Sequence, residues 1–579
     1  MDKNKIDYLL LGRVLGLAKP YRSIFLLAGI LTLVLAPLAI LRPYIIKIMV
    51  DDYIFKSDIT GLTWWTMVLI GILLVNVLLR YIFIYATNWL GQSVIKDLRV
   101  RVFNHISSLK LSYFDTTPIG TSTTRTINDI ETINTVFSQG AITILADLFT
   151  VFAVLAVMLM TSWKLTLVCL TTLPFLMMAT YVFKEKVKVS YQKVRKQVTQ
   201  MNAFLQERIT GMRIVQIFNA EEKELVKFSS INRKYTQANL DSILYYAVFF
   251  PVVEIISAAA LGLLVWWGAR GVIAGEVTTG TFITFPIYLS MLFRPIRMLA
   301  DRFNTLQMGL VAAERVFNLL DNEDIIENRG KIITPKLRGD IEFVNVGFAY
   351  NNEDYVLKDM NFKIKAGETL AICGSTGSGK STIINILNRF YEIQKGEILI
   401  DGVNIKDYEL SSLRKRIAIV LQDVFLFSGT VMENITLRDD RISEAEVIEA
   451  AKKIGAHEFI QRLPGGYSYE VMERGATLSM GQRQLVSFVR ALVFNPDILI
   501  LDEATSSIDP ESEAVIQHAI EKLIDKRTSI IIAHRLSTIR HTDNIMVLEK
   551  GKILEFGGHD TLLEIENGSY KEMYEMQFF

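Results

Sequence analysis

The chain has 579 residues, which is enough for about three to four ordinary domains. Its 62 basic and 61 acidic residues almost balance, so the charge gives no reason to expect a nucleic-acid partner. Hydrophobic residues make up 50% of the chain, which is unusual for a soluble enzyme and indicates membrane segments. The long apolar runs lie between residues 1 and 320, and the remainder has the mixed pattern of a soluble α/β domain.

The first predicted element is an amphipathic helix over residues 6–18. Apolar side chains recur there at helical spacing, at Ile6, Leu9, Leu10 and Val14. This pattern indicates a helix that lies on the inner membrane surface, and a frayed tail is the alternative. The first apolar run starts too late and is too long for a cleavable signal. We expect no accessory peptidase domain ahead of the helix.

Six apolar stretches are long enough to cross a bilayer, which needs about 20 residues. The predicted spans are residues 23–50, 62–90, 133–161, 164–184, 243–269 and 279–300. The third and fourth are separated by a very short turn, so they form a hairpin. Six buried helices of a soluble protein are the alternative, but the runs are too long and too uniformly apolar for it.

The distribution of lysine and arginine predicts the orientation. Residues before 23, between 91 and 132, and between 184 and 242 are rich in both, whereas the opposite loops carry only Lys56, Lys164 and Arg270. Because the basic side of a membrane protein faces the cytoplasm, both termini are expected inside. The charged connections keep a helical period, so the membrane helices are expected to continue into the cytosol. Turns are predicted near residues 113–120 and 207–211.

Four ionisable residues fall within the predicted spans, where charge is costly: Arg80, Glu254, Arg294 and Arg297. One interpretation is a polar, water-accessible cavity. The alternatives are mutual ion pairs or snorkelling toward the headgroups, and snorkelling is favoured for Arg294 and Arg297. The cysteines are not expected to pair, because Cys169 falls in an apolar helix and Cys373 in a cytosolic core strand. No cysteine–histidine spacing suggests a zinc site.

Residues 374–381 read Gly-Ser-Thr-Gly-Ser-Gly-Lys-Ser and fit the phosphate-binding loop at every fixed position. A short apolar run precedes them and predicts a buried strand, and Thr382 to Leu387 predict a helix. Glycines let backbone N–H groups close around phosphates at a helix N-terminus. Lys380 is expected to reach the β- and γ-phosphates, and Ser381 to ligate Mg²⁺. The candidate ATP-binding residues are Gly374, Ser375, Thr376, Gly377, Ser378, Gly379, Lys380, Ser381 and Thr382.

An apolar strand over residues 497–501 ends in two carboxylates, Asp502 and Glu503. Asp502 suits a Mg²⁺ contact, and Glu503 suits the general base that polarises the attacking water. The alternative is ordinary surface charge, which the preceding phosphate loop disfavours.

Leu478-Ser479-Met480-Gly481-Gln482 resembles the signature motif of ATP-binding cassette (ABC) proteins, and the resemblance covers essentially the whole chain. The chain resembles a half-transporter of the ABC exporter family. That resemblance implies an α-helical membrane domain with six transmembrane helices and long intracellular extensions, followed by an α/β P-loop NTPase domain. The expected boundaries are residues 1–320 for the membrane domain, 321–338 for a linker and 339–579 for the nucleotide-binding domain.

The resemblance implies roles for further residues. Tyr350 matches the aromatic that stacks on adenine, a contact that needs only a flat ring face. Gln422 matches the glutamine that senses Mg²⁺ and couples to the membrane domain, and His534 the histidine that contacts the γ-phosphate. Asp509 lies in the loop that crosses to a partner cassette. Residues 473–475 resemble an exporter-specific stretch of the cassette that touches the intracellular helices. Residues 114–120 and 207–221 resemble the two coupling-helix regions of the membrane domain.

The signature also implies a dimer. Ser479, Gly481 and Gln482 open a helix and would hold the γ-phosphate of a nucleotide on another cassette. Met480 departs from the family's commonest glycine, so both an identical and a related partner chain stay open, with the homodimer favoured. The implied activity is ATP-driven export of a lipid, lipophilic drug or peptide in a prokaryotic inner membrane. An ATP-gated channel or regulator is the alternative, and an importer is a weaker one.

Overall fold

The computed structural model describes residues 7–326, 328–351, 354–502, 510–532, 539–540 and 542–578. The chain forms two compact units. The first unit comprises Met1–Ser107 and Thr117–Glu323, and the second comprises Ser108–Thr116 and Asp324–Phe579. The short segment Ser108–Thr116 therefore belongs with the C-terminal part of the chain, although membrane helices precede and follow it in the sequence.

The first unit is helical. Among the described residues, six helical stretches are long and apolar enough to cross a membrane: Lys19–Ile54, Ile59–Ser108, Ile119–Thr161, Trp163–Thr210, Glu221–Ile273 and Thr279–Leu320. Its α-helices are α1 (Tyr8–Gly16), α2 (Arg22–Ile48), α3 (Ile59–Ser108), α5 (Ile119–Thr124), α6 (Ile130–Thr135), α7 (Ala141–Thr161), α8 (Trp163–Leu170), α9 (Leu173–Thr210), α10 (Met212–Ile217), α11 (Glu221–Ile273) and α12 (Thr279–Leu320).

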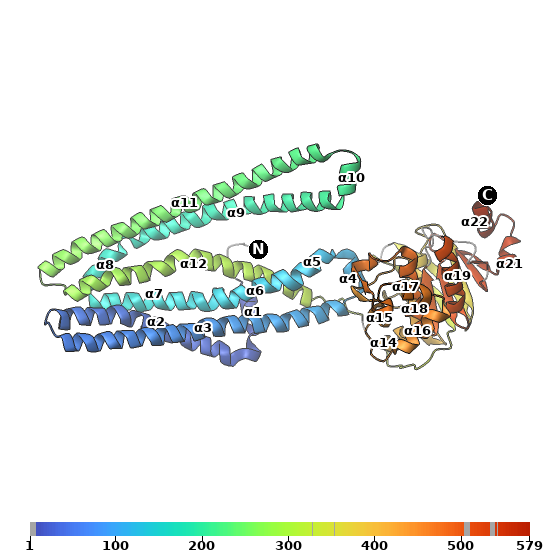
Figure 1. Ribbon diagram of the computed structural model, residues 1–579, viewed down its shortest axis with the longest axis horizontal. Helices are drawn as coiled ribbons and strands as arrows, with labels where there is room; N and C mark the ends of the chain where they lie inside the picture. The colour runs from blue at the N-terminus through green and yellow to red at the C-terminus, as the bar shows by residue number, and fades with distance from the viewer. Residues whose placement is uncertain are drawn as a thin grey trace. The chain divides into compact units, whose positions relative to one another are not determined.

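Several of these helices are longer than a bilayer requires. α3 has 50 residues, which at about 1.5 Å per residue is more than twice the hydrocarbon thickness of about 30 Å. α3 continues without a break beyond the predicted span 62–90, as the helical period of its polar continuation predicts. α9 and α11 pack against each other, joined by α10, and form an arm that leaves the other helices of this unit (Figure 1).

The fourth predicted span, 164–184, lies within the candidate span Trp163–Thr210, which is made of two helices. α8 ends at Leu170, and α9 begins at Leu173 with Pro174 in its first turn. Proline lacks the N–H that a helix interior needs, and the first turn, where Pro174 lies, is the position that tolerates it best. The third predicted span, 133–161, is also interrupted. Gly140 has non-helical backbone angles, and α7 begins at Ala141.

The second unit contains two main sheets. The six-stranded sheet has the order β12 (Lys552–Gly557), β11 (Asn544–Glu549), β3 (Thr369–Gly374), β10 (Thr528–Ile532), β9 (Ile498–Asp502) and β6 (Ile417–Val420). All its pairs are parallel except β11 with β12. The second sheet is antiparallel, with the order β2 (Tyr355–Ile364), β1 (Ile341–Ala349), β4 (Lys395–Ile400) and β5 (Val403–Asn404). A two-stranded ribbon pairs β7 (Gly429–Thr430) with β8 (Glu470–Val471).

The helices of this unit are α4 (Leu111–Thr116), α13 (Lys380–Leu387), α14 (Leu410–Arg414), α15 (Val431–Thr436), α16 (Glu444–Lys453), α17 (His457–Arg462), α18 (Met480–Val493), α19 (Pro510–Ile524), α21 (His559–Leu563) and α22 (Ser569–Phe578). Alternation along the parallel strands explains the two layers of core. In β3, Leu370 and Ile372 join the cluster that includes the antiparallel sheet and α13. Ala371 and Cys373 join the cluster that includes α16, α18 and α19. Burial on both faces explains why these strands read as continuous apolar runs.

Candidate nucleotide site

The glycine-rich loop lies between β3 and α13, at the carboxyl end of the parallel sheet. Gly374 has a φ of +145° and Gly379 a φ of +108°, values that favour glycine. A Cβ at Gly374 would also lie 2.1 Å from the carbonyl oxygen of Leu548. α13 begins at Lys380, directly after the loop. The strand, loop and helix expected for a phosphate-binding motif are therefore all present.

Several polar groups of this loop have no partner within the described residues. The backbone N–H groups of Thr376, Gly377 and Gly379 donate to no acceptor there. The side-chain oxygen of Ser378 is buried and also lacks a hydrogen-bond partner. Thr376 and Gly377 are exposed, whereas Ser378 is buried, and buried polar groups are normally paired. A buried hydroxyl beside open N–H groups at a helix N-terminus fits an anionic ligand such as the phosphates of ATP.

Lys380 is the charged group of the loop. Its side chain is buried, and Nζ donates to the carbonyl oxygens of Gly374 at 2.9 Å and Ser375 at 3.0 Å. Burial lowers the pKa of Lys380, while the carboxylate of Asp502 acts in the opposite direction. The ammonium is thus already held inside the loop where phosphate oxygens would enter. In the sheet, β10 alone separates β3 from β9, and all three strands are parallel, so the loop and Asp502 lie at the same end of neighbouring strands.

The candidate Mg²⁺ ligands follow strands of the same sheet. Ser381 opens α13 after β3, Asp502 ends β9, and Gln422 comes two residues after β6. The carboxyl ends of parallel strands lie at the same end of the sheet, so the topology brings these residues together at that end. Within the described residues, no group of three or more histidine, cysteine or acidic side chains is arranged to hold a metal ion. A hydroxyl, an amide and one carboxylate instead suit Mg²⁺, which keeps waters and shares substrate phosphates.

Tyr350 follows β1 and is half exposed, with 50% of its surface accessible. Its hydroxyl hydrogen-bonds Thr382 Oγ1 at 3.2 Å and accepts a longer bond of 3.4 Å from Asn385 Nδ2. Both partners lie on α13. Tyr350, which resembles the adenine-stacking residue, is therefore hydrogen-bonded to the helix that follows the phosphate loop. Half of its surface remains accessible to a base.

The signature residues lie at the start of α18. Ser479 caps this helix: its hydroxyl accepts from the N–H of Gln482 at 3.2 Å, and the Gln482 side chain accepts from the N–H of Ser479 at 3.0 Å. This reciprocal pair is a capping box. Gly481 is buried in the first turn. The expected helix start is confirmed, and the two side chains predicted to meet a phosphate hold each other in place.

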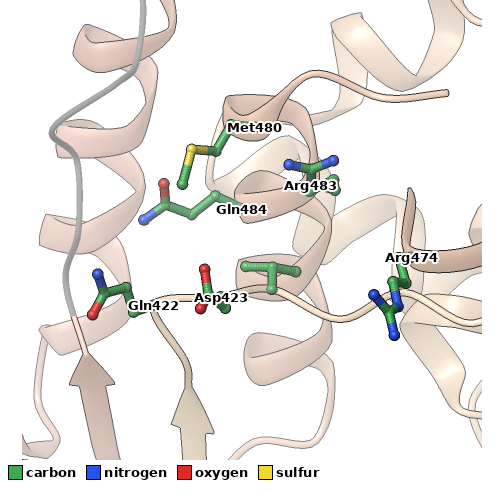
Figure 2. A pocket seen from close by; sticks show the side chains of 7 residues that line it. Gln422, Asp423, Arg474, Met480, Arg483 and Gln484 are labelled. Atoms are coloured by element: carbon green, nitrogen blue, oxygen red, sulfur yellow. The ribbon is translucent and has the colours of Figure 1, made fainter. Parts of the chain in front are cut away.

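Met480, the departure from the commonest signature, lines a pocket of about 230 Å³. The same pocket is lined by Gln422 and by Arg474 of the exporter-specific stretch, and by Asp423, Val424, Arg483 and Gln484. Figure 2 shows Met480 and Gln484 on α18, with Gln422 and Asp423 on the segment that follows β6. The side chain at position 480 is therefore accommodated in a space beside Gln422 and does not disturb the capping box.

Three predicted residues, Glu503, His534 and Asp509, lie outside the described residues. In the first unit, Arg80, Glu254 and Arg294 are exposed and form no ion pair with one another, and the side chain of Arg297 is outside the described set. One ion pair of this unit was not predicted from the sequence. Asp147 on α7 and Arg302 on α12 form an ion pair of 2.7 Å. Asp147 falls inside the third predicted span, so its charge was the available signal.

Comparison with known proteins agrees with this architecture. Residues 25–296 match the ABC transporter transmembrane region, and residues 357–506 match the ABC transporter family. An uncharacterised ABC transporter ATP-binding protein of Bacillus subtilis is 39% identical, covering 98% of this chain and 94% of its own length. An ATP-dependent lipid A-core flippase of Syntrophus aciditrophicus is 36% identical over 98% and 94%. A putative multidrug export ATP-binding/permease protein of Staphylococcus aureus is 37% identical over 98% and 99%. The chain therefore belongs to the ABC transporters, as a multi-pass membrane half-transporter of the exporter type that couples ATP hydrolysis to transport.

Proposed function

We propose that this exporter moves a lipid, a lipophilic drug or a hydrophobic peptide out of, or across, the prokaryotic inner membrane. The observation that carries the proposal is the similarity along the whole chain to proteins named as a lipid A-core flippase and as multidrug exporters. We further propose that residues 1–320 form the membrane domain, 321–338 a linker and 339–579 the nucleotide-binding domain. Both termini and the ATPase domain lie in the cytoplasm in this proposal, because the lysine-rich connections face that side.

We assign the nucleotide chemistry to the residues at the carboxyl end of the parallel sheet. The loop from Gly374 to Thr382 binds the phosphates, and Tyr350 stacks on the adenine. Ser381, Gln422 and Asp502 hold Mg²⁺, which when bound neutralises charge on the phosphate oxygens. Glu503 orients and deprotonates the attacking water, and His534 contacts the γ-phosphate. The orphaned donors of the loop and the buried ammonium of Lys380 support this assignment.

A second copy of the chain completes the site in this proposal. Ser479, Gly481 and Gln482 act on the nucleotide of the partner cassette, and Asp509 lies in the loop that crosses to it. The tip of the arm supports a partner as well. Met212, Ile214, Ile217 and Phe218 are 40%, 60%, 61% and 73% exposed, a group of apolar side chains that another protein surface would cover.

Reconstitution of the purified chain tests the proposal. In lipid vesicles with ATP and Mg²⁺, we expect ATP hydrolysis that lipids or lipophilic drugs stimulate, together with directional movement of a fluorescent lipid or dye. Light scattering should give a protein mass of twice 65.7 kDa. A folded dimer that stays inactive in lipid would contradict the homodimer and favour a heterodimer with a related chain. Hydrolysis without directional transport of any such compound would contradict the substrate class.

A further inference from the structure

Three aromatic rings form a cluster beside the phosphate loop. The ring centroids of Phe348 and Tyr350 lie 4.8 Å apart, and those of Tyr350 and Tyr391 lie 5.0 Å apart with an interplanar angle of 87°. Phe348 and Tyr391 are also in contact, at 5.9 Å. These edge-to-face contacts are the geometry that aromatic pairs prefer. Tyr391 therefore packs directly on the ring that we propose as the base platform.

The segment that carries Tyr391 is bound to the segment that carries Tyr350. The side-chain amide of Gln394 accepts from the N–H of Ala349 and donates to its carbonyl oxygen, both at 2.9 Å. Ala349 directly precedes Tyr350. The two segments are thus joined by side-chain-to-backbone hydrogen bonds as well as by ring contacts, and both kinds of contact connect Tyr350 with Tyr391.

Tyr391 reaches a second partner with its hydroxyl group, which donates a hydrogen bond to the carboxylate of Asp115 on α4. Burial raises the pKa of Tyr391, and the bond to Asp115 raises it further, so the phenol remains a donor at neutral pH. A bond from a hydroxyl to a carboxylate is stronger than one between neutral groups. The ring cluster therefore ends on α4.

The other end of α4 is attached elsewhere. Lys110 Nζ lies 2.7 Å from Asp324 Oδ1, and the Ser112 hydroxyl donates to Asp324 Oδ2 at 3.0 Å. These contacts involve none of the three rings. The contact at Asp115, in contrast, is connected to Tyr350 through the ring of Tyr391.

We propose that Tyr391 is a positioning residue that relays the stacking of a base on Tyr350 to α4 through its hydrogen bond with Asp115. The proposal rests on the proposed function, because it takes Tyr350 as the base platform. A purine ring on Tyr350 restrains the three-ring cluster and keeps the Tyr391 hydroxyl directed at Asp115. A triphosphate without a base occupies the phosphate loop but leaves Tyr350 uncovered, so it does not tighten α4.

Hydrogen exchange of the full-length protein in lipid nanodiscs tests this relay. The measured region is the amide groups of residues 112–116, with ATP or inorganic tripolyphosphate added in the presence of EDTA. A hydrogen bond to a charged group is worth enough to change such an opening equilibrium about tenfold. We expect ATP to slow exchange about tenfold in the parent protein and tripolyphosphate to leave it within twofold.

Tyr391→Phe keeps the ring and removes only the hydroxyl, and it should lose most of the slowing by ATP. Asp115→Ala alters an exposed position and should give the same loss, while the double variant should lose no more than either single variant. Tyr408→Phe is the matched control, because its hydroxyl donates to the carbonyl oxygen of Ile400 at 3.0 Å in the same unit. It should keep the full response to ATP.

Two results would overturn the relay: a full ATP response in Tyr391→Phe, or equal slowing by tripolyphosphate and ATP in the parent protein. Calorimetry of the parent protein separates this from a failure of the nucleotide site. Binding of ATP without a change at α4 contradicts the relay alone, whereas no binding of ATP contradicts the proposed site and the relay with it.

Discussion

Replacing Lys380 by alanine tests the phosphate loop most directly. Lys380 as a residue is only 7% exposed, so its attraction to a phosphate oxygen is less screened than that of a surface lysine. At about 4 Å and an effective dielectric constant of about 20, that attraction is about 4 kcal/mol. Lys380 must first give up bonds to the carbonyl oxygens of Gly374 and Ser375, at about 0.5–1.5 kcal/mol each.

The difference leaves about 1–3 kcal/mol in favour of binding, so Lys380→Ala should raise the Kd for ATP by about 5- to 150-fold. Isothermal titration of the full-length protein in nanodiscs with ATP and EDTA measures this without hydrolysis. Lys365→Ala is the control, since the Lys365 ammonium is 76% exposed and lies near Glu368 instead of the loop. Thermal unfolding of both variants checks that the fold is kept. A Kd for Lys380→Ala within twofold of the parent value would refute the assignment of this lysine to the phosphates.

Three further changes test other parts of the protein. Glu503→Gln should keep ATP binding and lower ATP turnover about a hundredfold or more, because a positioned general base is removed; turnover within a few-fold of the parent would place the base elsewhere. Ser479→Arg should abolish ATPase activity in a homodimer, because it sets a bulky charge against both sites; preserved activity would contradict the role of the signature in trans. Hydrogen bonds from the Ser411 hydroxyl and the Ser412 N–H lower the pKa of Glu409 to about 2. Its carboxylate therefore stabilises the fold at pH values above the ordinary glutamate pKa of about 4.3. This stabilisation is lost as the pH falls toward about 2. Glu409→Gln should therefore unfold at a lower temperature than the parent at about pH 6, where the Glu409 carboxylate is ionised, with a difference that shrinks below about pH 4. A difference that is constant with pH would contradict this role of the charge.

Local features of the fold could be predicted from the sequence because neighbouring residues determine them. The phosphate loop needs glycines at fixed positions, and the strand before it is an unbroken apolar run that ends at the loop. The helix after Ser479 begins with a capping box whose two partners are three residues apart. Six apolar stretches predict six candidate spans because the bilayer thickness sets their length.

Features that depend on distant contacts could not be predicted in this way. Asp147 and Arg302 are 155 positions apart along the chain, so only the packing of α7 on α12 shows that they pair. The partners Tyr391 and Asp115 are separated by 276 positions. The break between α8 and α9 lies inside a continuous apolar run, so hydropathy alone does not locate it. Met480 is a further case. The sequence shows that methionine replaces the commonest glycine of the signature, whereas the fold shows the pocket that accommodates its side chain.

The chain passes from one unit to the other at three places, after Ser107, after Thr116 and after Glu323. Lys110 and Ser112, which follow the first crossing, both contact Asp324, which follows the third crossing. These contacts hold the two crossings together within the second unit. These contacts involve no residue of the three-ring cluster. The second crossing differs, since Thr116 directly follows Asp115, the partner of Tyr391. In the proposed relay, the path from Tyr350 leads through Asp115 to the chain that continues into α5. If nucleotide binding acts on the membrane helices through this part of the protein, the segment from Asp115 to Ile119 is where its effect should be measured first.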